Sequence, residues 1–119
     1  MKITKDSWKR LSFPDKRENL DFSAFYSDAR GEAILAGHKP TDMDDRWFIY
    51  SEDGWIYFHR SWTGACIFAL KLDGSPIGIR TTDSWVTRDH SQYNWIDIKD
   101  ARGRLSKLID SYFPEPSNA

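Results

Sequence analysis

The residues best suited to chemistry in this chain follow an aromatic strand and read His59-Arg60-Ser61-Trp62-Thr63-Gly64. A guanidinium binds phosphate or carboxylate oxygens through paired hydrogen bonds, and hydroxyl groups and the N–H groups of a tight turn add further donors. An indole ring stacks on flat rings or cations. Packing of a strand does not require a cation followed by a hydroxyl-rich turn. This segment therefore predicts a recognition site for an anion that carries a ring.

Neighbouring aromatic and basic residues extend this candidate site. Strand alternation places Trp47 on the same face as Arg60. Arg88 lies on that face too, at the same end of the sheet, if the strand leading to it contains no bulge. Tyr93 belongs to the polar, aromatic segment that follows Arg88, and loops often carry binding groups. The predicted ligand-binding residues are Trp47, His59, Arg60, Ser61, Trp62, Thr63, Arg88 and Tyr93.

A purely structural interpretation of the same residues is about equally consistent with the sequence. Arg60 could form an ordinary ion pair with Glu52 or Asp89, and Trp62 could plug the surface. Gly64 fits a turn that needs a positive φ, which is a backbone requirement rather than a functional one. The two interpretations differ in whether the guanidinium of Arg60 faces a cavity or a carboxylate.

One arrangement suggests catalysis, because His59 and Cys66 are expected to lie opposite each other across a hairpin. Cys66 lies in the apolar run 65–70, however, where a lone cysteine usually packs as a small hydrophobe. A reactive thiolate also needs solvent access and a lowered pKa, and nothing in the sequence indicates either. We therefore predict no catalytic residue and favour binding over catalysis. An enzyme acting on nucleotide or ADP-ribose-like substrates, with His59 or His90 as acid–base, is a weaker alternative.

Metal and cofactor motifs are missing from the sequence. The histidines His38, His59 and His90 are scattered, and the acidic stretch 42–45 lacks the glycine and distal glutamate of a calcium loop. No phosphate-binding loop, dinucleotide fingerprint or nucleophile elbow is present. We predict neither a metal nor a cofactor.

Composition limits the classes of partner. The 119 residues include 17 basic and 18 acidic side chains, for a net charge of −1, which argues against binding a nucleic-acid polymer or an anionic membrane. A single cysteine cannot form an internal disulfide, and the first residues have no apolar signal core, so a cytoplasmic location is expected.

The periodicity of apolar residues predicts one α+β domain over residues 1–119. It contains an antiparallel sheet of about four strands, packed by a middle helix and a C-terminal helix. The strands are expected at 46–50, 55–60, 65–72 and 77–82, the last continuing towards 88, and the helices at 27–36 and 97–112. Residues 1–20 are expected to be irregular, and residues 114–119 to form a frayed tail.

Both faces of the predicted sheet are apolar, which is unusual for an antiparallel sheet with one wet side. If each hairpin has a four-residue loop, Phe68 and Leu70 share one face with His59, whereas Phe58 and Arg60 lie on the other. Both faces must then be covered, by the helices and the N-terminal segment, by a partner chain or by a ligand.

The segments 45–50 and 57–64 resemble a group of small uncharacterised bacterial and phage-associated proteins. Their shared pattern is a Trp-Phe-x-Tyr strand followed by Phe-His-Arg-Ser-Trp-Thr-Gly, and Val86-Thr87-Arg88-Asp89 is similar to part of it. The resemblance extends loosely from Phe22 to Tyr93. It implies where a site lies and carries no activity.

These observations predict a non-enzymatic binding module for a small anionic ligand that contains a ring, with a nucleotide or a nucleotide-derived signal as the expected ligand. Sequestration of such a signal is one biological form that the binding could take. By analogy alone, such sequestration is a strategy of phage anti-defence proteins. The alternative is a protein–protein module, such as an immunity protein or the subunit of a small homo-oligomer, because tryptophan and arginine dominate interface hot spots.

Overall fold

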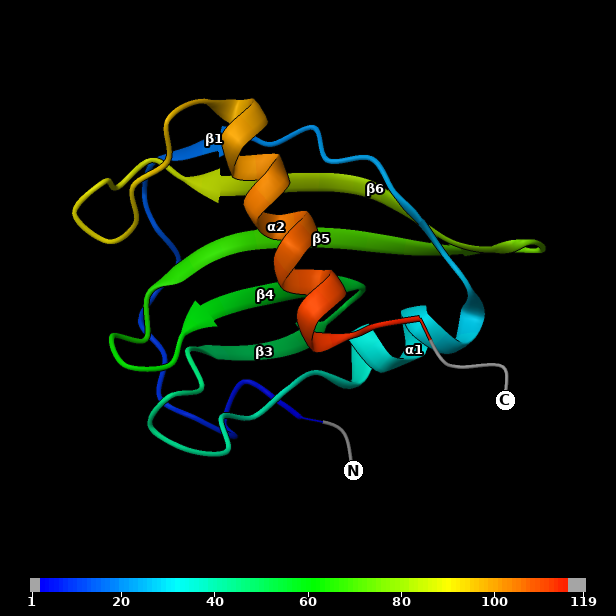
Figure 1. The fold of residues 1–119 in the computed structure, drawn as a ribbon, viewed down its shortest axis with the longest axis horizontal. Coiled ribbons are helices and arrows are strands. Elements are labelled where there is room, and N and C mark those ends of the chain that lie inside the picture. Colours follow the sequence, from blue (N-terminus) through cyan, green and yellow to red (C-terminus); the bar gives the residue numbers. More distant parts are fainter. Residues whose placement is uncertain (1–2, 116–119) are drawn as a thin grey trace.

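The computed structural model describes residues 3–115 as one antiparallel sheet crossed on one face by a helix (Figure 1). The strand order is β1-β6-β5-β4-β3, and β2 pairs with the beginning of β6, whereas β1 pairs with its end. In chain order the elements are β1 (Arg17–Asn19), β2 (Phe25–Tyr26), α1 (Asp28–Ala36), β3 (Trp47–Glu52), β4 (Trp55–Arg60), β5 (Cys66–Ser75), β6 (Gly78–Thr87) and α2 (Ile98–Tyr112).

The predicted α+β class and antiparallel sheet are confirmed, but the sheet has six strands rather than four. The two additional strands, β1 and β2, contain three and two residues. Strands this short carry no alternation that a sequence pattern could show. Part of the segment 1–20, expected to be irregular, therefore adds a strand to the sheet. Most of the tail expected at 114–119 lies outside the described residues.

The two long hairpins are tighter than the four-residue loops expected from the sequence. Asp53 and Gly54 have φ angles of 53° and 83°, as the two central residues of a type I′ turn require, and Glu52 pairs with Trp55. Pairing of β5 with β6 likewise continues to its last residue, Ser75. The loops are shorter than expected because the paired strands keep forming backbone hydrogen bonds up to a turn whose twist matches their own.

A bulge between β4 and β5 changes which side chains share a face. Phe58 pairs with Phe68, but the next residue, His59, pairs with Cys66, so one extra residue of β5 lies between the pairs. The extra residue turns Phe68 and Leu70 to the face of Phe58, so the expectation that they share a face with His59 is wrong. One inserted residue is enough, because side chains alternate with a period of two.

Both faces of the sheet are covered, as its two-sided apolar pattern predicts. On one face, side chains of the central strands form a single core with α1 and α2. The helical members of this core are Ile34, Ala101, Leu105, Leu108 and Ile109. On the other face the N-terminal segment runs behind the sheet (Figure 1). There Phe13 stacks on Tyr57 with 4.5 Å between ring centroids.

Both helices begin at a capping residue, and α1 ends at a glycine. The side chain of Ser27 accepts a hydrogen bond from the N–H of Arg30 at the start of α1, and Asp97 caps α2 in the same way. Gly37 ends α1 with a φ of 84°, which favours glycine. Within residues 3–115, none of the helices has the length and apolar character needed to cross a membrane.

The contact between α1 and β6 supplies a test of the packing. A Cβ added at Gly31 would clash with the side chain of Ile79, whose Cβ would lie 3.1 Å away, so Gly31→Ala should lower the free energy of unfolding by about 1–3 kcal/mol relative to an unobstructed Gly→Ala change in a helix. Gly103→Ala on α2 is the matched control, because nothing lies within 4 Å of the added Cβ. It should raise stability by up to about 1 kcal/mol through helix propensity. Urea unfolding of both variants measures the difference, and equal effects would contradict this packing.

Candidate functional site

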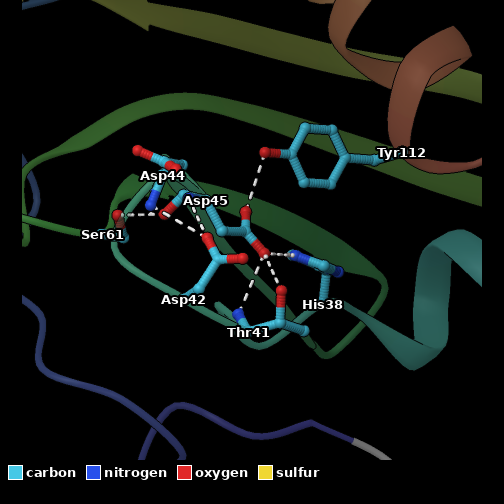
Figure 2. Close-up of polar contacts among 7 residues, drawn as sticks. All are labelled: His38, Thr41, Asp42, Asp44, Asp45, Ser61 and Tyr112. Atoms are coloured by element: carbon cyan, nitrogen blue, oxygen red, sulfur yellow. Dashed lines mark hydrogen bonds and ion pairs between the residues drawn. The ribbon is translucent and has the colours of Figure 1, made fainter.

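The carboxylate of Asp45 is the centre of a hydrogen-bond network just before β3 (Figure 2). One oxygen, Oδ2, lies 2.6 Å from Nε2 of His38 and accepts from the N–H of Thr41 at 3.0 Å. The other, Oδ1, accepts from the hydroxyl of Tyr112 at 2.8 Å. Only 9% of the Asp45 side chain is exposed. The network thus joins the last turn of α2 to the connector between α1 and β3.

The network keeps Asp45 ionised and Tyr112 protonated. Burial opposes ionisation of Asp45, but hydrogen bonds from His38, Tyr112 and Thr41 outweigh it and lower the pKa of the carboxyl. Burial, reinforced by the bond to Asp45, raises the pKa of Tyr112 to about 12. Tyr112 therefore remains a donor and Asp45 an acceptor throughout the neutral pH range.

The same connector holds the Ser61–Gly64 turn in place. The hydroxyl of Ser61 donates to the carbonyl of Asp45 at 2.7 Å, and its N–H donates to the carbonyl of Arg46 at 2.8 Å. The indole N–H of Trp62 donates to the carbonyl of Met43 at 2.9 Å. Although Trp62 is 66% exposed, its ring is therefore fixed in orientation.

Arg60 lies between aromatic rings at the end of β4. Its guanidinium carbon is 5.1 Å from the ring centroid of Trp47 and 5.7 Å from that of Tyr93, within cation–π range. Within residues 3–115, no carboxylate lies within ion-pair distance of Arg60, so the expected pairing with Glu52 or Asp89 is not observed. The half-buried guanidinium is oriented by ring faces and keeps its hydrogen-bonding capacity.

Two adjoining cavities open beside Arg60. The first, which we name the basic cavity, has a volume of about 380 Å³ and lies between the end of the sheet and α2. Four basic side chains and one carboxylate line it, although the whole chain has a net charge of −1. The charged residues are Arg46, Arg60, Arg104, Lys107 and Asp44. Arg104 also pairs with Asp100 at 3.0 Å, which leaves three basic side chains without a carboxylate partner among the described residues.

The second, the Trp62 cavity, has a volume of about 550 Å³ and is the more enclosed of the two. Its lining consists of Met43, Asp44, Arg46, Arg60, Trp62 and Thr63. Asp44, Arg46 and Arg60 line both cavities, so these are neighbouring parts of one groove. One end of the groove presents positive charge, and the other presents an indole held by a hydrogen bond to the Met43 carbonyl.

A third cavity, of about 610 Å³, lies on the N-terminal side of Trp62 and is the largest of the three. Lys9 is its only basic side chain, and it contains none of the arginines of the groove. A large, mainly apolar hollow offers little to hold an anion. We therefore assign the candidate site to the groove formed by the other two cavities, where charge and aromatic surface coincide.

The structure brings together five of the eight residues predicted for the site. The residues that line the groove are Trp47, Arg60, Trp62, Thr63 and Tyr93. The hydroxyl of Ser61 is buried and already donates to the Asp45 carbonyl. Arg88 is exposed and lines neither cavity of the groove. It follows the end of β6, and β5 lies between that end and the end of β4.

His59 has a different environment from the groove residues. It is fully buried on the sheet face covered by the N-terminal segment, where Nδ1 lies 2.7 Å from the carbonyl of Gly64. Burial lowers the pKa of His59, so it stays neutral. Burial also raises the pKa of its pairing partner Cys66, which makes a reactive thiolate unfavourable. His90, the other histidine considered for acid–base chemistry, packs near Trp95 outside the groove.

Sequence reasoning missed Arg46, Arg104, Lys107 and Asp44. Arg104 and Lys107 are three residues apart on a helix, so they occupy one exposed face, and this spacing is a signal that could have been used. Nothing in the sequence shows that this helix face lies beside the end of β4. In residues 3–115, no three metal-ligating side chains come together.

No protein-family model, curated protein or solved structure matches the chain. The function of the groove must therefore be argued from its own residues and geometry.

The Asp45 network predicts a specific dependence of stability on pH. Because the pKa of Asp45 is lowered in the folded protein, its contribution is present above its ordinary pKa of about 3.9 and is lost as pH falls through the folded value. Asp45→Asn should lower the free energy of unfolding at pH 7 by about 1–3 kcal/mol. Urea titrations from pH 7 to pH 3 should show this difference shrinking at acidic pH.

The control for this measurement is Asp73→Asn, which neutralises an exposed carboxylate of β5 that belongs to no described ion pair. It should leave stability nearly unchanged. If the deficit of Asp45→Asn stayed constant from pH 7 to pH 3, the lowered pKa would be wrong.

Proposed function

We propose that the chain is a non-enzymatic binding module for a small anionic ligand that contains a ring, and that the ligand is a nucleotide or a nucleotide-derived signal. The observation that carries the proposal is Arg60, a half-buried arginine oriented by two rings and open to a groove, with no carboxylate partner among residues 3–115. An oriented, unneutralised guanidinium is suited to bind phosphate oxygens in pairs.

The charge of the basic cavity supports an anionic ligand. Arg46 and Lys107 face the same cavity as Arg60, and neither belongs to a described ion pair. Collecting like charges on one side of a nearly neutral protein is unfavourable unless an anion balances them. A phosphate carries enough charge to do so.

The shape of the groove supports a ligand with a ring. The indole of Trp62 is held by its bond to Met43 and offers a flat, exposed surface beside the cations. Both cavities fall in the range of about 300–1,000 Å³ that is usual for small-molecule sites. The phosphate would occupy the basic cavity, and the base would stack on Trp62.

A binding role fits these residues better than catalysis. The two histidines considered for acid–base chemistry, His59 and His90, line neither cavity of the groove. General acid–base catalysis at neutral pH usually uses a histidine, and no histidine lines the groove. Sequestration of a nucleotide signal is one biological form that this binding could take.

Protein recognition is the second candidate, favoured by a different observation. Trp62 and Met43 are 66% and 77% exposed and lie side by side. Adjacent exposed side chains of this type, beside arginines, resemble an interface hot spot. An immunity protein or the subunit of a small oligomer would use such a patch. Concentration-dependent self-association that Trp62→Ala abolishes would favour the oligomer.

Titration with AMP, GMP, CMP, UMP and cyclic mononucleotides tests the first candidate. At a hundredfold excess over Kd, a bound nucleotide should raise the free energy of unfolding by about 2.7 kcal/mol. Arg60→Ala should raise the Kd about tenfold to a hundredfold, because a charge-assisted hydrogen bond is lost. Calorimetry at two salt concentrations should show weaker binding at the higher one.

The matched control is Arg80→Ala, which removes an exposed arginine of β6 that lines neither cavity and should leave the Kd unchanged. Arg88→Ala tests whether Arg88 contacts the ligand, as the sequence predicts, or lies outside the groove, as in the structure. A loss of affinity as large as that of Arg60→Ala would place Arg88 at the ligand. Absence of any nucleotide-dependent shift would show the proposal to be wrong.

A further inference from the structure

Asp44 occupies an unusual position in the groove. It is the only acidic residue that lines the basic cavity, and it also lines the Trp62 cavity. A residue shared by both cavities lies beside the middle of any ligand that spans them. The two other shared residues, Arg46 and Arg60, are both cations.

The carboxylate of Asp44 is not committed to these cations. No ion pair within 4.0 Å joins it to any described basic residue, although two arginines line the same cavities. Its own main chain is fixed, because its N–H donates to Oδ1 of Asp42 at 2.9 Å. In Figure 2 its side chain points away from the hydrogen-bonded carboxylate of Asp45. Asp44 is thus an exposed acceptor that takes part in no described ion pair.

A free carboxylate next to a phosphate site restricts what the ligand can place there. An ionised carboxylate only accepts hydrogen bonds, and it repels a phosphate, so its neighbour in the complex must be a neutral donor. In a nucleotide the part between phosphate and base is the ribose, whose 2′- and 3′-hydroxyls are such donors. Carboxylates take this role towards ribose in unrelated nucleotide-binding folds.

We propose that Asp44 accepts hydrogen bonds from the vicinal hydroxyls of the ribose and makes the groove selective for ribonucleotides. This inference rests on the proposed nucleotide-binding function. The phosphate binds Arg60 and Arg46, the base stacks on Trp62, and Asp44 reads the sugar between them. Asp44 is then a specificity residue rather than a source of affinity, because its charge also opposes the phosphate.

The test compares each 5′-ribonucleoside monophosphate with its 2′,3′-dideoxy analogue by calorimetry. The full chain should bind the ribose form about tenfold or more tightly, since a hydrogen bond to a charged group is lost in the analogue. In the Asp44→Ala variant the preference for the ribose form should vanish. The variant should also bind the dideoxy form more tightly than the unaltered chain does. Asp73→Ala, which removes an exposed carboxylate outside the groove, should leave the preference unchanged.

The outcomes separate this inference from the proposal on which it rests. If ribose and dideoxy forms bind equally and Arg60→Ala weakens both, the groove binds nucleotides and the role of Asp44 is wrong. If the ribose preference persists in Asp44→Ala, another residue reads the sugar and the inference is overturned. The inference would also be overturned if Asp44→Ala removed a preference for one base and left the binding of ribose and dideoxy forms equally affected. If no nucleotide of either series binds, both proposals are wrong.

Discussion

A single, largely buried carboxylate holds together the end of the molecule that carries the groove. Asp45 accepts from His38 and Thr41 of the connector and from Tyr112 of α2, and its carbonyl accepts from Ser61. A carboxylate in so little contact with water is stable only when its oxygens are fully hydrogen bonded, so these partners must stay in place together. The geometry of the groove follows, because Asp44 and Arg46 are its immediate neighbours in the chain.

A second constraint is the way in which Arg60 is oriented. An arginine is usually fixed by a carboxylate, which also neutralises it and uses its donors. Here the faces of Trp47 and Tyr93 perform the positioning. Cation–π contacts are directional with respect to the ring face and leave the N–H edge of the guanidinium free. A half-buried position and an unused charge can therefore coexist at the end of β4.

Much of the fold follows from local patterns in the sequence. The capping residues Ser27 and Asp97, the glycine at 37 and the Asp-Gly turn mark the elements almost to the residue. The short edge strands and the bulge in β5 do not, because pairing with distant residues determines them. The bulge turned Phe68 to the helix-covered face, a change that no local pattern indicates.

The site divides in the same way. The residues near Arg60 in the chain, such as Trp47 and Trp62, could be recognised from their types and spacing. Arg104 and Lys107 could not be assigned to the groove, because that requires knowing how α2 crosses the sheet. Arg88 was included on the assumption that its end of the sheet is close to that of Arg60. Strand order decides this point, since β5 lies between the ends of β4 and β6.

The connector that contains His38 also shields the outermost strand from other copies of the chain. β3 is the last strand on its side of the sheet, and its sequence, Trp-Phe-Ile-Tyr-Ser-Glu, is the kind that recruits further strands when its edge is open. His38 exchanges both backbone hydrogen bonds with Ile49 in the middle of that edge, at 2.8 and 2.9 Å. Damage to the Asp45 network that released His38 would therefore leave the edge of β3 open to pairing with other chains.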